Sequence, residues 1–135
     1  MTDVRALTIK QPHAALVAAG LKGVENRSWP LPAGYSGPLL IHAGKADDAD
    51  GWRAVGEALE GFKVVYGAFV AVAMNVTCHW GETCCTDRGG ELRSWHWTLT
   101  AVTPIEPVPA TGRLRLWTPE PEAVSACLAG SQRLG

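Results

Sequence analysis

The chain has 135 residues, of which 47% are hydrophobic and 19% charged, and its formal net charge is -1. This length suits one domain with its own hydrophobic core, so we expect a single domain over residues 1–135 with an ordered core at about 6–129. A protein that binds long nucleic acid through many phosphates usually carries a basic excess. That excess is missing, so the composition argues against an extended nucleic-acid surface and restricts any such site to a small one.

The sequence also suggests a compartment. The first residues lack the apolar stretch of a signal peptide. No segment reaches the 18 consecutive apolar residues that would indicate a membrane span. Four cysteines in such a chain are expected to be reduced thiols. We therefore expect a cytoplasmic protein that makes no membrane contact, while the sequence leaves its oligomeric state open.

Hydrophobic periodicity predicts the elements of the first half. Strands are expected at 6–10, from Val24 onward and at 38–43. Pro12 can start a helix over 13–19, which Gly20 closes in a left-handed conformation. A second helix should begin at Asp47 or Asp48 and end at Gly61, with its core-facing side chains at helical spacing: Trp52, Val55 and Leu59.

The second half reads as long strands and one helix. The apolar run 68–80 predicts a central strand, 82–93 a surface loop and 95–102 a further strand. Three prolines at 104, 107 and 109 predict a rigid connector that is not a central strand. A last strand is expected at 113–117, and then a helix that opens at 118–119 and ends at Gly130, followed by a fraying tail. About six strands and three helices in mixed order suit a small α+β barrel-like fold.

Polar residues of contrasting chemistry gather after the first helix. Side chains alternate along a strand, so Glu25, Arg27 and Trp29 share one face, with Lys22 in the turn before them. Lysine and arginine can hold a phosphate, glutamate can accept a base's amino protons, and an aromatic ring can stack a base. We expect these residues to converge on one concave site, joined by two residues from the next strand and turn, His42 and Lys45. The alternative is an ion pair that only stabilises the barrel.

Four segments resemble the ASCH domain family, a relative of the PUA domain. They are Gly20-x-Lys22-x-x-Glu25-x-Arg27, Leu7-Thr-Ile-Lys-Gln-Pro12, Gly37-Pro-Leu-Leu-Ile-His-Ala-Gly-Lys45 and Gly112-Arg-Leu-Arg-Leu-Trp117. The resemblance implies a PUA-like mixed β-barrel with flanking helices and a cleft beside the first helix. It also implies a function, the binding of RNA, a nucleotide or a modified nucleoside in that cleft.

The family resemblance leaves catalysis open. Some small ASCH proteins are similar to amidohydrolases that deacetylate N4-acetylcytidine, and there the lysine matching Lys22 is catalytic. Their catalytic threonine is replaced here by Glu25, which would have to take a catalytic role itself. Their later glutamate has no counterpart in the strand 68–80, and Glu82 and Glu91 lie in a predicted loop. Other members resemble ribonucleases, so the rivals to binding are an amidohydrolase, a ribonuclease and a protein-interaction module.

Two further groups of residues attract attention. Cysteine and histidine bind zinc, but no Cys-x-x-Cys pair is present, and strand neighbours Cys78 and His79 should face opposite ways. We therefore expect no metal or other cofactor at the group Cys78, His79, Cys84 and Cys85, with His96 as a neighbour. Trp95 and Trp97 share a strand face, and we expect them to pack in the core.

Overall fold

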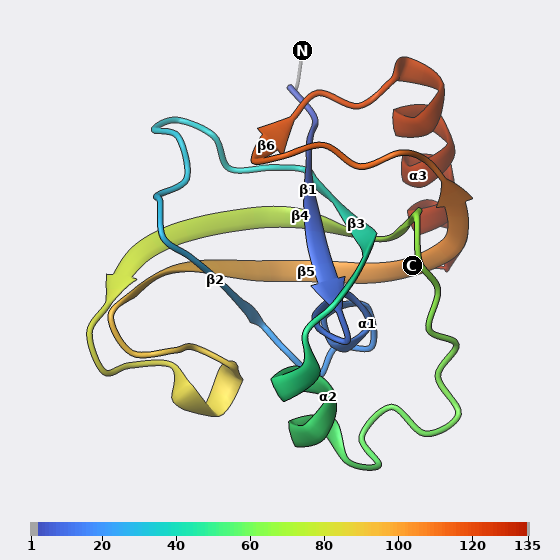
Figure 1. Ribbon diagram of the computed structural model, residues 1–135. Helices are drawn as coiled ribbons and strands as arrows, with labels where there is room; N and C mark the ends of the chain where they lie inside the picture. The colour runs from blue at the N-terminus through green and yellow to red at the C-terminus, as the bar shows by residue number, and fades with distance from the viewer. Residues whose placement is uncertain (1–2, 135) are drawn as a thin grey trace.

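The structure, a computed structural model, describes residues 3–134. Within them, six strands form one mixed sheet in the order β2-β5-β4-β3-β1-β6, and three α-helices surround it. The curved sheet forms a half-barrel with edge strands β2 and β6 (Figure 1), which confirms the α+β, PUA-like expectation. In chain order the elements are β1 (Arg5–Gln11), α1 (His13–Ala18), β2 (Val24–Arg27), β3 (Leu39–Asp47), α2 (Ala49–Val55), β4 (Ala68–Gly81), the 3-10 turn Thr86–Arg88, β5 (Ser94–Pro109), β6 (Leu116–Trp117) and α3 (Pro121–Leu134).

Both faces of the sheet are covered, because alternate residues of its strands enter different apolar clusters. On one face, Leu7 and Ile41 pack with Val17 of α1 and with Trp97. On the other face, the clustered residues include Ala6, Leu40, Phe69, Val72 and Cys127 of α3. In Figure 1, α3 lies against one end of β5, while α1 lies at the far end of β1. The residues Ala68–Ala73 of β4 are all buried, as the predicted central strand requires.

The proline-rich segment 104–109 corrects the prediction of a connector. It is the second half of β5, and it pairs antiparallel with β4 from Pro104 opposite Ala71 to Pro109 opposite Ala68. β2 pairs only with Trp95–Thr98, so in the described chain the later part of β5 has a partner strand on one side only. Proline is tolerated at such an edge, where its missing N–H costs no ladder hydrogen bond.

Three other boundaries differ from the predictions. α2 ends at Val55, because Gly56 takes a positive φ of 53°, and its residues are exposed or half-buried and do not enter the core. Leu59 is buried, but it lies in the turns that follow. α3 continues through Gly130 to Leu134, so the tail is helical that far. β6 is only two residues long, since Arg115 has a φ of 59°, which a strand cannot accommodate.

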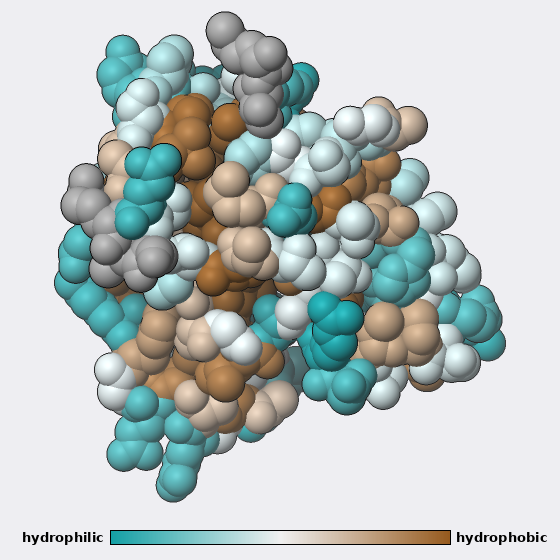
Figure 2. Space-filling view, turned by 180° about the vertical axis from the view of Figure 1, so that it is seen from behind, coloured by the Kyte–Doolittle hydropathy of each residue, from teal (hydrophilic) through white to brown (hydrophobic). Residues whose placement is uncertain are grey.

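Figure 2 shows the opposite face of the molecule, where hydrophobic side chains lie near the middle and hydrophilic ones mostly around the rim. Among residues 3–134, no helix combines the length and the hydropathy needed to cross a membrane.

Candidate functional site

β2 brings the charged motif to the inner face of the half-barrel. The strand pairs antiparallel with β5, with Glu25 opposite Trp97 and Arg27 opposite Trp95. Opposed residues in a sheet point to the same side, so Glu25 and Arg27 share the face covered by α1, as the alternation predicts. Gly20 closes the turn after α1 with a φ of 77°, and two residues later Lys22 reaches the same face.

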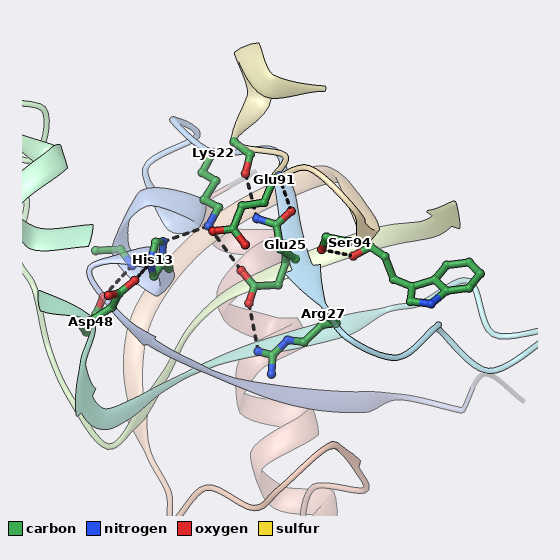
Figure 3. A network of polar contacts seen from close by, with 12 residues as sticks. His13, Lys22, Glu25, Arg27, Asp48, Glu91 and Ser94 are labelled. Carbon is green, nitrogen blue, oxygen red and sulfur yellow. Dashed lines mark hydrogen bonds and ion pairs between the residues drawn. The ribbon is translucent and has the colours of Figure 1, made fainter. Parts of the chain in front are cut away.

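The motif's side chains form a continuous polar network (Figure 3). Glu25 is only 6% exposed, and its carboxylate lies between two cations. Its Oε2 accepts a hydrogen bond from Arg27 Nη2 at 3.0 Å, and its Oε1 lies 3.7 Å from Lys22 Nζ. Arg27 Nη2 also donates to the carbonyl of Thr8 on β1 at 3.1 Å. Glu25 therefore connects the turn after α1, through Arg27, to β1.

His13 and Asp48 extend the network, and the sequence analysis did not identify either as a site residue. Lys22 Nζ donates to His13 Nδ1 at 2.9 Å, and His13 Nε2 lies 2.7 Å from Asp48 Oδ2. Hydrogen bonds from His13 and then from the Gly51 backbone lower the pKa of Asp48. The position of His13 at the first residue of α1, directly after β1, was the available signal, because a side chain there projects past the helix end.

Lys22 is held rather than free. Its side chain is 11% exposed, and the loop between β4 and β5 covers its stem. A Cβ added to Gly89 would lie 2.8 Å from Lys22 Cγ, so only glycine permits this approach. The ammonium group is thus fixed between His13 and Glu25.

A cleft of about 430 Å³ opens beside this network. Its lining carries five of the chain's 12 Lys and Arg residues and one carboxylate, that of Glu25. The five cations come from β1, β2, β3 and the segment before β6, and they are Lys10, Arg27, Lys45, Arg113 and Arg115. A chain with a net charge of -1 therefore concentrates positive charge at one opening of its barrel.

Three predicted site residues lie outside that lining, which is drawn from residues 3–134, and they are Lys22, Trp29 and His42. Lys22 contacts two residues that do line the cleft, His13 and Glu25. β2 ends at Arg27, and Trp29 lines a neighbouring cleft instead. The Trp29 and Trp97 rings pack edge to face with their centroids 4.8 Å apart. The guanidinium carbon of Arg115 lies 4.2 Å from the centroid of the Trp29 ring. His42 is 1% exposed, and its Nε2 lies 2.8 Å from the Ala110 carbonyl. It lines an adjoining pocket that shares Thr8 and Lys45 with the charged cleft.

Comparison with known proteins identifies a family. No curated protein matches the chain. The model of the ASCH domain matches residues 7–108, which extends from within β1 through most of β5 and includes the whole charged motif. Since this match spans well over half of the chain, and the half-barrel with three helices has the expected PUA-like form, the protein belongs to the ASCH domain family.

Proposed function

We propose that the protein binds RNA, a nucleotide or a modified nucleoside in the charged cleft. The observation that carries this proposal is the grouping of five cations around one opening in a chain without a basic excess. ASCH domains are in general RNA-binding domains, which supports the same ligand class. The small size of the cleft favours one or two nucleotides over a long strand.

Arg27 is the proposed centre of recognition. Its Nε is buried and lacks a hydrogen-bond partner among the described residues. A buried donor left unpaired costs about 1–3 kcal/mol, and a phosphate or carbonyl oxygen in the cleft would pair it. The exposed cations Lys45, Arg113 and Arg115 would hold further phosphate oxygens. Glu25 keeps free lone pairs beside Arg27 and would accept an amino proton of a base.

Trp29 adds a second feature at the border of the cleft. Arg115 lines both the charged cleft and the neighbouring one that contains Trp29. A second base leaving the cleft would meet this stacked pair, on which stacking contributes about 1–3 kcal/mol per base.

The test is binding of a fluorescent dinucleotide and of single modified nucleosides to the wild type and two lysine variants. Lys45→Met removes an exposed cation that lines the cleft, and Lys63→Met removes another exposed one that does not. We expect Lys45→Met to weaken dinucleotide binding by roughly tenfold or more, as for a lost charged hydrogen bond. Lys63→Met should leave the affinity unchanged. Equal losses, or no binding by the wild type, would contradict the proposal and leave a protein-interaction module as the better account.

One observation favours a second candidate, an amidohydrolase or ribonuclease. The chain of contacts from Asp48 through His13 to Lys22 would orient Lys22 and take up a proton from it. N4-acetylcytidine and a short RNA are the substrates to assay. If Lys22→Met retained binding but lost turnover, Lys22 would act in the transition state. Arg27→Met is the control, because arginine stays protonated and cannot act as a base. A wild type that binds without turnover would exclude this candidate for these substrates.

A further inference from the structure

The β4–β5 hairpin gathers thiols and imidazoles at its tip. His79 on β4 and His96 on β5 are direct cross-strand partners, with ring centroids 5.1 Å apart. The connection between the strands folds back through the 3-10 turn Thr86–Arg88, and this return brings Cys84 and Cys85 to the two rings. Ligand atoms from these four residues all lie within 4.8 Å of one another.

We propose that His79, Cys84, Cys85 and His96 bind one zinc ion. Zinc prefers four tetrahedral thiolate and imidazole ligands, with Zn–S near 2.3 Å and Zn–N near 2.0–2.1 Å. Those bond lengths place sulfur and nitrogen ligands roughly 3.6 Å apart. The Sγ atom of Cys84 lies 3.4 Å from His79 Nε2 and 3.8 Å from His96 Nδ1, and the Sγ atom of Cys85 lies 3.6 Å from His79 Nε2. The three spacings thus bracket the value for a common metal centre.

The orientation of His96 supports a ligand role. Its Nε2 lies 2.7 Å from the Glu91 carbonyl, which can only accept a hydrogen bond, so Nε2 carries the proton. The Nδ1 lone pair is then directed toward Cys84. A metal-bound histidine usually donates its other N–H to a carbonyl or carboxylate in this way.

A glycine reserves the space for this ring. A Cβ on Gly81 would lie 2.0 Å from Cε1 of His96, which is fully buried. The imidazole is therefore locked in position, which is the preorganisation that a metal site needs.

The third thiol of this region is built differently. Cys78 precedes His79 on β4, so it points to the other side of the strand. Its Sγ accepts a hydrogen bond from the Leu31 backbone amide at 3.3 Å. The sequence argued against zinc because it has no Cys-x-x-Cys pair and because Cys78 and His79 face opposite ways. The folded hairpin instead brings Cys84 and Cys85 of the loop to the two strand histidines.

Zinc at this point would fix the loop that borders β2. The amide of Gly23 donates to the Arg88 carbonyl at 3.1 Å, and the Asn26 side chain joins both Gly89 and Glu91 at 2.9 and 2.8 Å. The proposed ion would thereby hold the edge strand that carries Glu25 and Arg27. The site itself does not depend on the proposed nucleotide binding.

The experiment is a titration of the purified full chain with Co²⁺ and then Zn²⁺, in a phosphine reductant that keeps the cysteines as thiols. We expect one equivalent of Co²⁺ to give the absorption bands of a tetrahedral thiolate site, and Zn²⁺ to displace it. Cys84→Ser should weaken binding by roughly 100-fold or more, beyond the 10–100-fold effect of second-shell changes. Cys78→Ser is the matched control and should change binding less than threefold.

A second readout is thermal unfolding, in which Zn²⁺ should raise the Tm of the wild type and of Cys78→Ser but not of Cys84→Ser. Because Cys84 is exposed, its serine variant should fold, and circular dichroism of the metal-free proteins checks this. The absence of a stoichiometric Co²⁺ complex would overturn the proposal, and so would equal losses in the two cysteine variants.

Discussion

Glu25 is a buried carboxylate whose partners decide what it does. With Arg27 Nη2 at 3.0 Å and Lys22 Nζ at 3.7 Å, its charge is compensated on both sides. Removing one partner of a buried pair is strongly destabilising, because the remaining charge stays in a poorly solvated place. An exposed pair gains little, since water screens it. The chain contains pairs of both kinds, and two of them with similar separation permit a direct comparison.

A double-mutant cycle tests this difference. Glu25→Gln, Arg27→Met and their combination should show a coupling free energy of about 1 kcal/mol or more in urea unfolding. The same cycle at Glu82 and Arg93, which lie 3.4 Å apart with side chains 62% and 80% exposed, should give a coupling close to zero. Equal couplings in the two cycles would show that burial does not strengthen the Glu25 pair.

His42 predicts how stability depends on pH. Burial lowers its pKa from the ordinary value of 6.5, despite the opposing contact with the Ala110 carbonyl. The unfolded chain therefore binds this proton more readily, so the stabilisation is complete above pH 6.5 and is lost as the pH falls below it. The slope from this residue is at most about 1.4 kcal/mol per pH unit. His42→Gln should reduce the pH dependence of the unfolding free energy just below pH 6.5. An NMR titration giving His42 a pKa at or above 6.5 would contradict the prediction.

At the scale of elements, α3 covers one face of the sheet, and the reactivity of one thiol reports whether it stays packed there. Cys127 is fully buried among Phe69, Val72 and Trp117, and burial raises its pKa to about 11. Its thiolate is therefore rare at neutral pH, and reagents reach it only when α3 leaves the sheet.

Site-resolved alkylation measures this docking. With a chelator present to free the hairpin thiols, Cys127 should react at least about 100-fold more slowly than exposed Cys84. Adding urea below the unfolding midpoint should accelerate Cys127 only in proportion to the opened population. Labelling of Cys127 as fast as Cys84 in native buffer would mean that α3 is not stably packed.

Local patterns were enough to predict some elements, and tertiary placement decided the others. The alternation at Glu25 and Arg27 is a property of four residues, so β2 and its inward face were predictable. The prolines of β5 were misleading, because only the sheet order shows that the pairing of β5 with β2 stops at Thr98 and leaves that edge of β5 unpaired. His13 was not predicted for the same reason, and the thiols and imidazoles of the hairpin were noticed as a group but expected to bind no metal. Their partners come from α2's N-terminal flank and from a returning loop, and no sequence spacing encodes those contacts.

At the scale of the whole molecule, positive charge is local rather than spread. In the proposed binding mode the cleft cations would face one or two phosphates, so few counterions would be released. The logarithm of affinity should fall with the logarithm of salt with a slope of about -0.7 to -1.4, by the factor of roughly 0.7 per phosphate for single strands. Fluorescence titrations of a dinucleotide and of a 12-mer at several salt concentrations measure this slope. A slope near -4 for the 12-mer would indicate a long groove covering six or more phosphates and would contradict the compact-cleft proposal.

The bond from Arg27 to the Thr8 carbonyl has a mechanical consequence. Among residues 3–134 the sheet does not close on itself, and along this seam no strand pairing joins β2 to β1, while the Arg27 guanidinium donates a hydrogen bond across it. This side-chain hydrogen bond can break without disrupting any strand pairing. β2 can therefore move relative to β1 at the charged cleft. A ligand bound there would contact both strands and restrict their relative motion. Backbone amides of β2 should then exchange hydrogen more slowly with a dinucleotide bound, while those of central β4 stay unchanged.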